Sequence, residues 1–407
     1  MLDKRVELTE WLHTIQQSQP LADALLRKSA AEQQEQGYFH TLREICQQPL
    51  TWFSTADLVV AHCDRLAVSL HGVGNIILTG SGSSEYIGEC VRLPLQSDLN
   101  VPTSVIGGGV LVTQGTRAVP PGRPALMVSL ARSGDSPEST GAVSLFLDSD
   151  SDIRHLILTC NGKGKLATLP TSPRLTVLTL DDSTNDRSLV MTSSFSNLVL
   201  AARSLGYLDR IDDYAHLCRA LSKIAQRILL EQFGNIAAIA QSAFRRVVFL
   251  GSGSRFGAAR ESALKMLESS AGRVATMSET YLGLRHGPMS FVHQNTLIVC
   301  FLSCDSSLRG FECDLLVELE QKGLGMTKIV VGERIPPEIL GEGDLAIECP
   351  GLAEAGDQNA PVIDVLVSQL LAFFRSRHEG LHPDAPSNGV INRVVQTFQM
   401  HFPTTAP

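Results

Sequence analysis

The chain has 407 residues, of which 43% are hydrophobic and 19% charged, and its formal net charge is −8. A chain of this length exceeds one ordinary hydrophobic core, so we expect a globular protein with two domains or a duplicated one. The negative charge without a basic run argues against a nucleic-acid partner, and no apolar run approaches membrane-spanning length. The N-terminus also lacks the apolar core of a signal peptide, which predicts a cytoplasmic protein without a membrane partner.

The nine cysteines are scattered singly along the chain, with no CxxC pair and no His/Cys cluster at the spacing of a zinc site. We therefore expect reduced thiols that pack in the core, and we predict no disulfide, no structural metal and no cofactor.

The first part of the chain is predicted to be helical. Apolar residues such as Trp11 and Ile15 recur at helical spacing, Pro20 interrupts the pattern, and a further helical pattern covers residues 56–70. Nothing here suggests chemistry, so packing or oligomer contact is the expected role of residues 1–50.

A strand, a loop and a helix follow. The apolar residues 75–79 predict a buried strand, the sequence Gly-Ser-Gly-Ser-Ser occupies 80–84, and we expect the next helix to end at Pro94. A Gly/Ser loop at a helix N-terminus is a ready anion site, because backbone N–H groups and the helix dipole point at it. The loop lacks a P-loop lysine, and Gly82 is followed next by Gly88 rather than at GxGxxG spacing, which disfavours a dinucleotide-binding enzyme.

A second strand and loop repeat this arrangement. Residues 124–130 form the expected strand, and the loop at 131–138 is rich in hydroxyl groups, with Ser136 as N-cap and Pro137 as the first residue of a helix. Either loop alone is equally well explained by ordinary capping residues. Two such loops meet at the carboxyl edge of a parallel sheet, which favours a phosphate site.

Further strands are expected at residues 155–159 and 175–180, and a helix begins within 191–196. Residues 247–254 then repeat residues 76–83 at a displacement of 171, and the second strand and loop recur at a similar displacement from residue 297. The chain is therefore predicted to be a tandem duplication.

Strands at 328–331 and 345–347 and a helix at 362–374 complete the second copy. We expect an α/β fold with two tandem, doubly wound parallel-sheet lobes. The expected domains are a helical N-terminal segment at 1–50, the lobes at 51–210 and 215–378, and a tail at 379–407.

Three charged residues, Glu261, Lys265 and Glu268, fall at i, i+4 and i+7, so they share one face of an expected helix. Downstream, His286 stands just before a Gly-Pro turn. A carboxylate, an ammonium and an imidazole can move protons on a small substrate. Alternatively, Glu261 and Lys265 form a surface ion pair and the histidine is structural.

The doubled Gly-Ser-Gly-Ser loops, the Ser-Gly-Asp-Ser sequence at 133–136, the Glu-Lys-Glu helix and the Arg-His-Gly-Pro sequence resemble the sugar isomerase (SIS) domain family. The resemblance is to its two-SIS branch of flavodoxin-like lobes, which includes the isomerase half of glucosamine-6-phosphate synthase. The tail sequences at 380–384 and 392–395 are similar to AgaS proteins, which are galactosamine-6-phosphate deaminase/isomerases also called tagatose-6-phosphate ketose/aldose isomerases. The resemblance covers about residues 50–395.

The resemblance implies a binding site for the substrate phosphate on the first two loops. The residues at the matching positions are Ser81, Gly82, Ser83, Ser84, Ser133 and Ser136. Arg132 replaces an uncharged glutamine of the synthase, so it is expected either to add a charged contact or to point away. Ser193 matches a serine beside the sugar. The synthase has a C-terminal lysine over the site, where this chain is longer and offers Arg393 nearby.

The resemblance also implies catalytic roles. Glu268 matches the general base that moves a proton between C2 and C1, His286 matches the ring-opening residue, and Lys265 matches a lysine beside the base. In the synthase the histidine reaches the active site of the neighbouring subunit, which implies a homodimer or a higher homo-oligomer, with the tail over the active site.

The implied function is conversion of galactosamine 6-phosphate to tagatose 6-phosphate and ammonia. Met1 is followed by Leu2, so no N-terminal cysteine is expected to release ammonia from glutamine, which favours deamination over synthesis. Two alternatives stay open: a tagatose-6-phosphate ketose/aldose isomerase that releases no ammonia, and a sugar-phosphate sensor without catalysis. A sensor would usually lack the Glu/His pair and carry a DNA-binding segment. The configuration of the substrate at C4 is not predicted.

Overall fold

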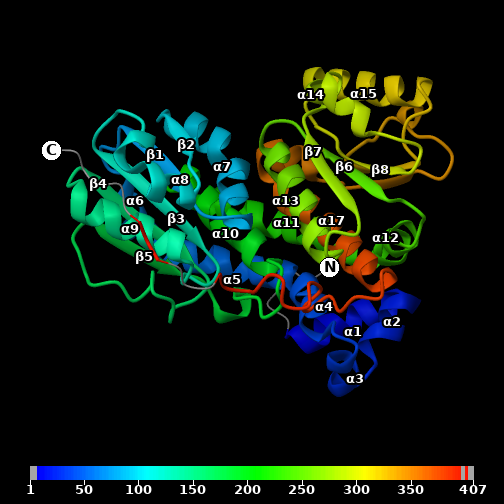
Figure 1. Ribbon diagram of the computed structural model, residues 1–407, viewed down its shortest axis with the longest axis horizontal. Coiled ribbons are helices and arrows are strands. Elements are labelled where there is room, and N and C mark those ends of the chain that lie inside the picture. The colour runs from blue at the N-terminus through cyan, green and yellow to red at the C-terminus, as the bar shows by residue number, and fades with distance from the viewer. Residues whose placement is uncertain (1–6, 396–398, 402–407) are drawn as a thin grey trace. The chain divides into compact units, whose positions relative to one another are not determined.

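The computed structural model describes residues 7–395 and 399–401 (Figure 1). The chain forms two compact units. We call the unit with residues 51–186, 193–218 and 391–407 the first-sheet unit, and the unit with residues 1–50, 187–192 and 219–390 the second-sheet unit. The domain bounds expected from the sequence stay a prediction.

The first-sheet unit is built on a five-stranded parallel sheet with the strand order β2-β1-β3-β4-β5. Its strands are β1 (Asn75–Thr79), β2 (Thr103–Val105), β3 (Ala125–Ala131), β4 (Ile153–Thr159) and β5 (Leu175–Thr179). Its helices are α5 (Gln48–Ala61), α6 (Cys63–Leu70), α7 (Ser83–Leu99), α8 (Gly108–Gln114), α9 (Pro137–Ser149) and α10 (Ser193–Arg203). This order is that of a flavodoxin-like doubly wound sheet, whose ligands bind at the carboxyl ends of the strands.

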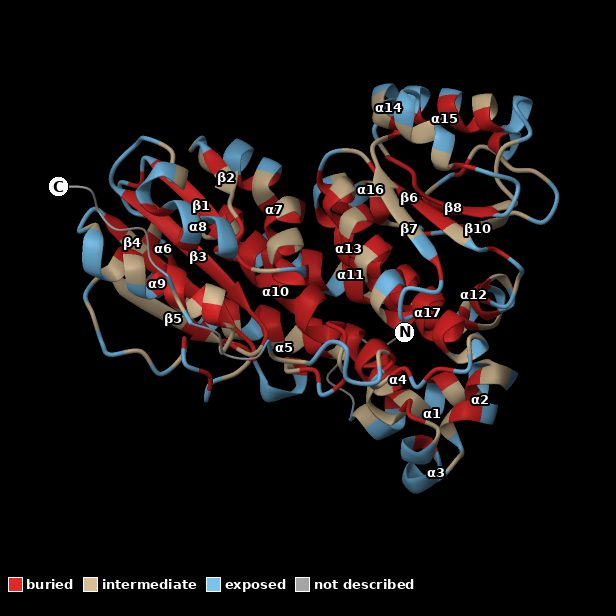
Figure 2. Cartoon of the chain, viewed as in Figure 1, coloured by how far each residue is buried: buried red, intermediate tan, exposed pale blue. Residues whose placement is uncertain are grey.

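Helices cover both faces of this sheet. On one face, Ile77 and Met127 pack against apolar residues of α8 and α9, among them Leu111 and Phe146. On the other face, α7 approaches the sheet closely, since a Cβ at Gly88 would lie 3.2 Å from Leu78 Cβ. The central strands are buried throughout (Figure 2). Continuous apolar strands are what a sheet covered on both faces requires.

The second-sheet unit repeats this architecture with the order β10-β9-β8-β6-β7, again all parallel. Its strands are β6 (Arg246–Leu250), β7 (Ala275–Glu279), β8 (Thr296–Phe301), β9 (Thr327–Gly332) and β10 (Leu345–Glu348). Its helices are α1 (Leu8–Ser18), α2 (Pro20–Leu26), α3 (Ala30–Glu35), α4 (Phe39–Cys46), α12 (Phe233–Ala240), α13 (Ser254–Ser269), α14 (Tyr281–Leu284), α15 (Ser306–Gln321), α16 (Leu352–Ala355) and α17 (Pro361–His378).

Helix α11 (Ile211–Glu231) runs from one unit into the other. Short 3-10 helices are η1 (Gly115–Ala118), η2 (Asp182–Thr184), η3 (Ser204–Tyr207), η4 (Gly287–Phe291), η5 (Pro337–Ile339) and η6 (Asp357–Asn359).

In the second-sheet unit, α14 and α15 cover one face of the sheet, where Leu284 and Leu316 pack with Val248 and Leu250 of β6. Helix α13 packs on β6 and β7 and against α17. The start of the tail is tied to the N-terminal helices, because the Asp384 carboxylate accepts hydrogen bonds from the backbone N–H of Thr41 at 2.7 Å. The N-terminal helices are therefore packed parts of this unit.

The duplication predicted from the sequence is confirmed by register and backbone conformation. Ile76 of β1 pairs with Leu126, and Val247 of β6 pairs with Leu297, so both partners are displaced by 171. The glycines before the two corresponding helices have nearly the same conformation, with φ +59° and ψ −127° at Gly82 and φ +56° and ψ −127° at Gly253. Residues other than glycine rarely adopt these backbone angles, which explains why the glycine recurs in both loops.

One sequence expectation needs correction, and two strands were missed. Helix α7 does not end at Pro94 but continues to Leu99, because Pro94 is buried with Val91 and Leu95 and this packing outweighs one lost backbone hydrogen bond. Strands β2 and β7 were not predicted. The first has three residues and the second, Ala275–Glu279, is half-exposed and largely polar, so neither carries a clear apolar pattern.

All nine cysteines are free thiols. Among the described residues, no helix is both long and apolar enough to span a bilayer. Within residues 7–395 and 399–401, no group of three or more His, Cys, Asp or Glu side chains is arranged to hold a metal ion.

Candidate active site

The first candidate loop joins β1 to α7. Ser83 and Ser84 begin the helix and are buried, and Gly82 is the residue before it. Gly80 is required, since a Cβ there would lie 2.6 Å from the backbone of Ser84. The Ser81 hydroxyl is buried and has no hydrogen-bond partner in the described part of the chain. The positive end of α7 and these hydroxyls suit an anion.

The second candidate loop follows β3 and lies beside the first. The register pairs Thr79 with Ser129, so the two strands deliver their loops to the same edge of the sheet. Gly108 stands between the loops, because a Cβ there would lie 3.1 Å from Ser81 Oγ and 3.5 Å from the backbone carbon of Glu138. Ser81 of the first loop therefore lies near the start of α9, where the second loop ends, and a shared phosphate site stays a prediction.

The hydroxyls of the second loop are partly engaged. Ser136 is the N-cap residue of α9, but its hydroxyl donates to Ser139 Oγ at 2.8 Å instead of capping the helix. Ser133 Oγ accepts from the backbone N–H of Asp135 at 3.2 Å, and its carbonyl accepts from the Asn161 side chain. These bonds fix the loop and leave hydroxyl lone pairs and rotation for a ligand.

Arg132 and Arg393 lie together within the first-sheet unit. Arg132 donates from Nη2 to the carbonyl oxygen of Arg393 at 2.6 Å, and its side chain is buried. Arg393 in turn donates from Nε to the carbonyl oxygen of Asp186 at 2.6 Å and from Nη2 to Asn185. The segment at Arg393 is therefore held beside the second loop by two guanidinium groups.

Asp186 holds the start of α10 and was missed by the sequence reasoning. Its carboxylate accepts from the backbone N–H groups of Ser193 at 3.1 Å and Ser194 at 2.9 Å. Ser193, the predicted sugar-contacting residue, is fully buried at this helix start. The signal was available, because Asp357 stands 171 residues after Asp186 in the second copy.

Helix α13 presents the predicted catalytic carboxylate and ammonium. The Lys265 side chain is only 2% exposed, and its Nζ is bonded to Glu268 Oε2 and lies 3.5 Å from Glu261 Oε1. Glu261 is fully buried, whereas the Glu268 side chain is 23% exposed. The three residues share one helical face as the sequence predicted, and of the two acids Glu268 is the one that a substrate can reach. Glu261 and Lys265 are not a surface ion pair, because both side chains are almost completely buried.

His286 lies between α14 and η4 in the second-sheet unit, and it is exposed. Its neighbour Arg285 donates to Glu318 at 2.8 Å. An imidazole on the surface can serve a site formed with a second copy of the chain, and its role stays a prediction.

The phosphate-binding candidates thus belong to the first-sheet unit and the proton-transfer candidates to the second-sheet unit. The first group supplies hydroxyls, a helix N-terminus and guanidinium groups for an anion. The second supplies a carboxylate, an ammonium and an imidazole for acid–base chemistry.

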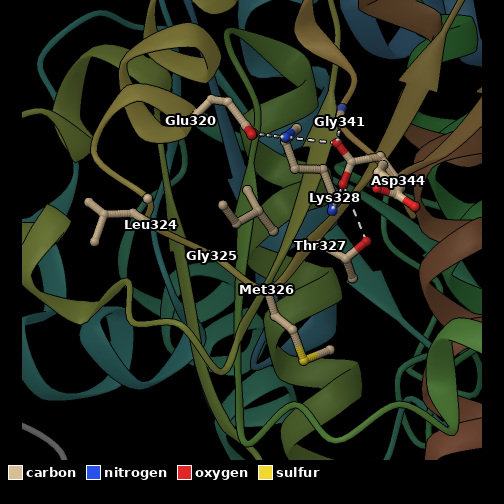
Figure 3. A pocket seen from close by; sticks show the side chains of 11 residues that line it. Glu320, Leu324, Gly325, Met326, Thr327, Lys328, Gly341 and Asp344 are labelled. Atoms are coloured by element: carbon tan, nitrogen blue, oxygen red, sulfur yellow. Dashed lines mark hydrogen bonds and ion pairs between the residues drawn. The ribbon is translucent and has the colours of Figure 1, made fainter.

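A separate pocket of about 150 Å³ lies at the opposite, amino-terminal edge of the second sheet, where β9 begins (Figure 3). Lys328 crosses it, with its Nζ 2.8 Å from Glu320 and 2.7 Å from Asp344. Ligand sites of doubly wound sheets lie at the carboxyl edge, so this pocket is distinct from the candidate site.

Two copies of one parallel strand order, each with a Gly-Ser-Gly-Ser turn before the helix that follows its first strand, define a protein with tandem SIS domains. No family model matches the chain. It is 32% identical over 394 residues to the D-galactosamine-6-phosphate deaminase AgaS of Shewanella sp. (strain ANA-3), covering 93% of this chain and 96% of the relative. A relative from Streptomyces coelicolor, also with AgaS in its name, is 35% identical over 370 residues, 89% of this chain and 95% of its own. The chain belongs to the AgaS family.

Solved structures agree with this assignment. The tagatose-6-phosphate ketose/aldose isomerase of Escherichia coli superposes with a TM-score of 0.81 at 30% identity, covering 90% of this chain and 97% of that one. The C-terminal domain of glucosamine-fructose-6-phosphate aminotransferase from Francisella tularensis has a TM-score of 0.71 at 19% identity, covering 84% and 96%. At that identity the second match shows the fold alone.

Proposed function

We propose that the chain is an amino-sugar phosphate deaminase/isomerase that converts galactosamine 6-phosphate to tagatose 6-phosphate and ammonia. The observation that carries the proposal is the buried Lys265 ammonium bonded to the partly exposed Glu268 carboxylate, in a chain whose AgaS relatives are named D-galactosamine-6-phosphate deaminases. An acid–base pair of this kind is what aldose–ketose proton transfer requires.

In the proposed complex, the substrate phosphate is bound at the first two loops. Its oxygens accept hydrogen bonds from the hydroxyls and loop N–H groups at the N-terminus of α7. The residues proposed to bind it are Ser81, Gly82, Ser83, Ser84, Ser133 and Ser136. Arg132 and Arg393 add positive charge beside this loop, and Ser193 contacts the sugar. The phosphate fixes one end of an open-chain substrate, which lowers the entropic cost of aligning C2 with the base.

The proposed chemistry moves one proton and hydrolyses one C=N bond. His286 of a neighbouring subunit assists ring opening, and the Glu268 carboxylate removes the C2 proton to give an enolamine. The same proton returns to C1, which leaves an imine at C2. Water adds to this imine, and ammonia leaves as the ketone forms. Lys265 holds the Glu268 carboxylate by its ion pair and offsets negative charge that develops on the C1 oxygen.

This mechanism includes an assembly. We propose a homodimer or larger homo-oligomer in which His286 completes the partner's site and residues 379–395 lie over the active site. Residues 396–398 and 402–407 of the expected tail lie outside the described residues. Exposure of His286 supports this part of the proposal.

A tagatose-6-phosphate ketose/aldose isomerase without ammonia release is the second candidate, favoured by the name of the Escherichia coli structure. It would use the same base and differ only in whether C2 carries an amine or a hydroxyl group. The test is ammonia release measured with galactosamine 6-phosphate, glucosamine 6-phosphate and tagatose 6-phosphate. Ammonia from galactosamine 6-phosphate, with tagatose 6-phosphate in equal amount, is expected. Interconversion of tagatose 6-phosphate with an aldose phosphate, and no ammonia from either amino sugar, would support the isomerase instead.

A further inference from the structure

The second Gly-Ser-Gly-Ser loop, at residues 251–254, has the backbone conformation of the first but different neighbours. It joins β6 to α13, and Gly253 has nearly the angles of Gly82. Gly251 is required for the same reason as Gly80, because a Cβ there would lie 2.4 Å from the backbone of Arg255. The Gly-Ser loop has therefore been duplicated together with the sheet that holds it.

The Ser252 hydroxyl of this second loop and a backbone N–H of the loop after β8 are both occupied by one side chain of the same unit. Ser252 Oγ donates to Glu312 Oε1 at 2.7 Å, and the backbone N–H of Ser303, just after β8, donates to Glu312 Oε2 at 2.7 Å. Glu312 projects from α15 and is fully buried. Its two oxygens thus bridge the same two loops that, in the first-sheet unit, are proposed to bind the phosphate.

A second carboxylate, that of Asp357, binds further donors of the loop after β8. It accepts hydrogen bonds from the backbone N–H of Cys304 at 2.9 Å and from the hydroxyl of Ser303. Arg255, at the position that corresponds to Ser84, pairs with Asp364 at 2.6 Å and lies 3.5 Å from Asp357. The cation nearest the second loop is therefore engaged by internal acids.

The residue that corresponds to Glu312 in the first copy is a serine. The buried residues Leu315, Leu316 and Leu319 of α15 match Ala142, Val143 and Phe146 of α9 at a displacement of 173, which places Ser139 opposite Glu312. The displacement of 171 in the strands places Ser81 opposite Ser252. Ser81 Oγ is buried without a partner among the described residues, whereas Ser252 Oγ has Glu312. The two loops differ at the position that decides whether an internal carboxylate reaches them.

We propose that the Glu312 carboxylate occupies the anion position of the second Gly-Ser loop, so that this loop cannot bind a phosphate, whereas the short side chain of Ser139 leaves the Ser81 loop available to one. The part of this inference that concerns Ser81 rests on the proposed function. The identity of residues 139 and 312 thus determines which copy of the duplicated loop binds substrate.

The burial of Glu312 fits a retained role. Burial raises the pKa of Glu312 to about 7, although the bonds from Ser303 and Ser252 and the charge of Arg255 oppose the change. Burying this carboxyl group costs desolvation energy. Its oxygens can accept the hydrogen bonds from Ser252 and Ser303 whether the group is protonated or ionised.

The test is titration with inorganic phosphate, together with phosphate soaked into crystals. Wild-type protein is expected to bind one phosphate per chain, at the Ser81 loop. Ser139→Glu should weaken phosphate binding at least tenfold, because it places a carboxylate where Glu312 stands in the second copy, while the control Ser139→Ala retains it. The double variant Glu312→Gly with Asp357→Asn should bind a phosphate at the Ser252 loop.

Three results would overturn the inference. These are a phosphate at the Ser252 loop of the wild type, wild-type affinity in folded Ser139→Glu, or a folded double variant with an empty Ser252 loop. The wild-type arm decides even if a variant does not fold. Failure of the proposed function alone gives a different pattern, in which the wild type binds no phosphate and the double variant binds one.

Discussion

His155 of β4 should make the protein less stable in mild acid. Its side chain is 1% exposed, and neither ring nitrogen has a hydrogen-bond partner in the described part of the chain. Burial, with a smaller contribution from Arg174, lowers the pKa of His155 from 6.5 to about 4. Between these pH values the unfolded chain binds a proton at His155 that the folded protein does not. The contribution of His155 to the free energy of unfolding is therefore fully present above pH 6.5 and is lost as the pH falls toward 4.

The shift of the His155 pKa corresponds to about 3 kcal/mol of unfolding free energy over this interval, at 1.36 kcal/mol per pKa unit. The assay is the free energy of unfolding by urea at pH 7.5, 5.5 and 4.5 for wild type and His155→Leu. The variant should lose less stability than the wild type on acidification, by up to about 3 kcal/mol. His71→Leu, at an exposed position, is the control and should follow the wild type. Equal pH dependence of wild type and His155→Leu would refute the reasoning.

Further predictions concern the active site. Lys265→Met should lower kcat by roughly 10²- to 10³-fold with little change in KM, because the cation beside the base is lost; unchanged kcat in steady-state assays would contradict its role. Ser81→Ala should raise KM for the sugar phosphate roughly tenfold at unchanged kcat, since it removes a hydrogen bond to a charged group, and an unchanged KM would exclude Ser81 from the phosphate site. Mixing inactive Glu268→Gln with inactive His286→Ala subunits should restore about a quarter of the wild-type activity, because random dimers then contain intact shared sites. No recovery after verified subunit exchange would place both residues in one subunit's site.

Much of the fold could be predicted because local signals agreed with the tertiary structure. The central residues of β1 are apolar because both faces of the strand are covered, and the glycines at 80 and 82 allow the tight turn that follows it. The strand pattern and the glycines recur 171 residues later. Edge strands β2 and β7 could not be predicted, since their pairing is set by the neighbouring strand and not by their own composition. The continuation of α7 past Pro94 likewise depends on packing that the sequence does not display.

The candidate site was only partly accessible to sequence reasoning. The charged face of α13 follows from helical spacing, but the burial of Lys265 between two carboxylates follows from packing. Glu312 carried no local signal, because a glutamate in a helix is ordinarily a surface residue. Its match to Ser139 of the first copy follows from the packing of α9 and α15, which the sequence does not display.

Ammonia release from galactosamine 6-phosphate by wild type and Glu268→Gln, measured side by side, tests the central claim most directly. Glu35→Gln is a matched control, because Glu35 is an exposed residue of α3. Removal of the base should lower kcat by at least about 10²-fold while substrate binding is nearly unchanged, and the control should match the wild type. Near wild-type kcat in Glu268→Gln would contradict the proposed mechanism.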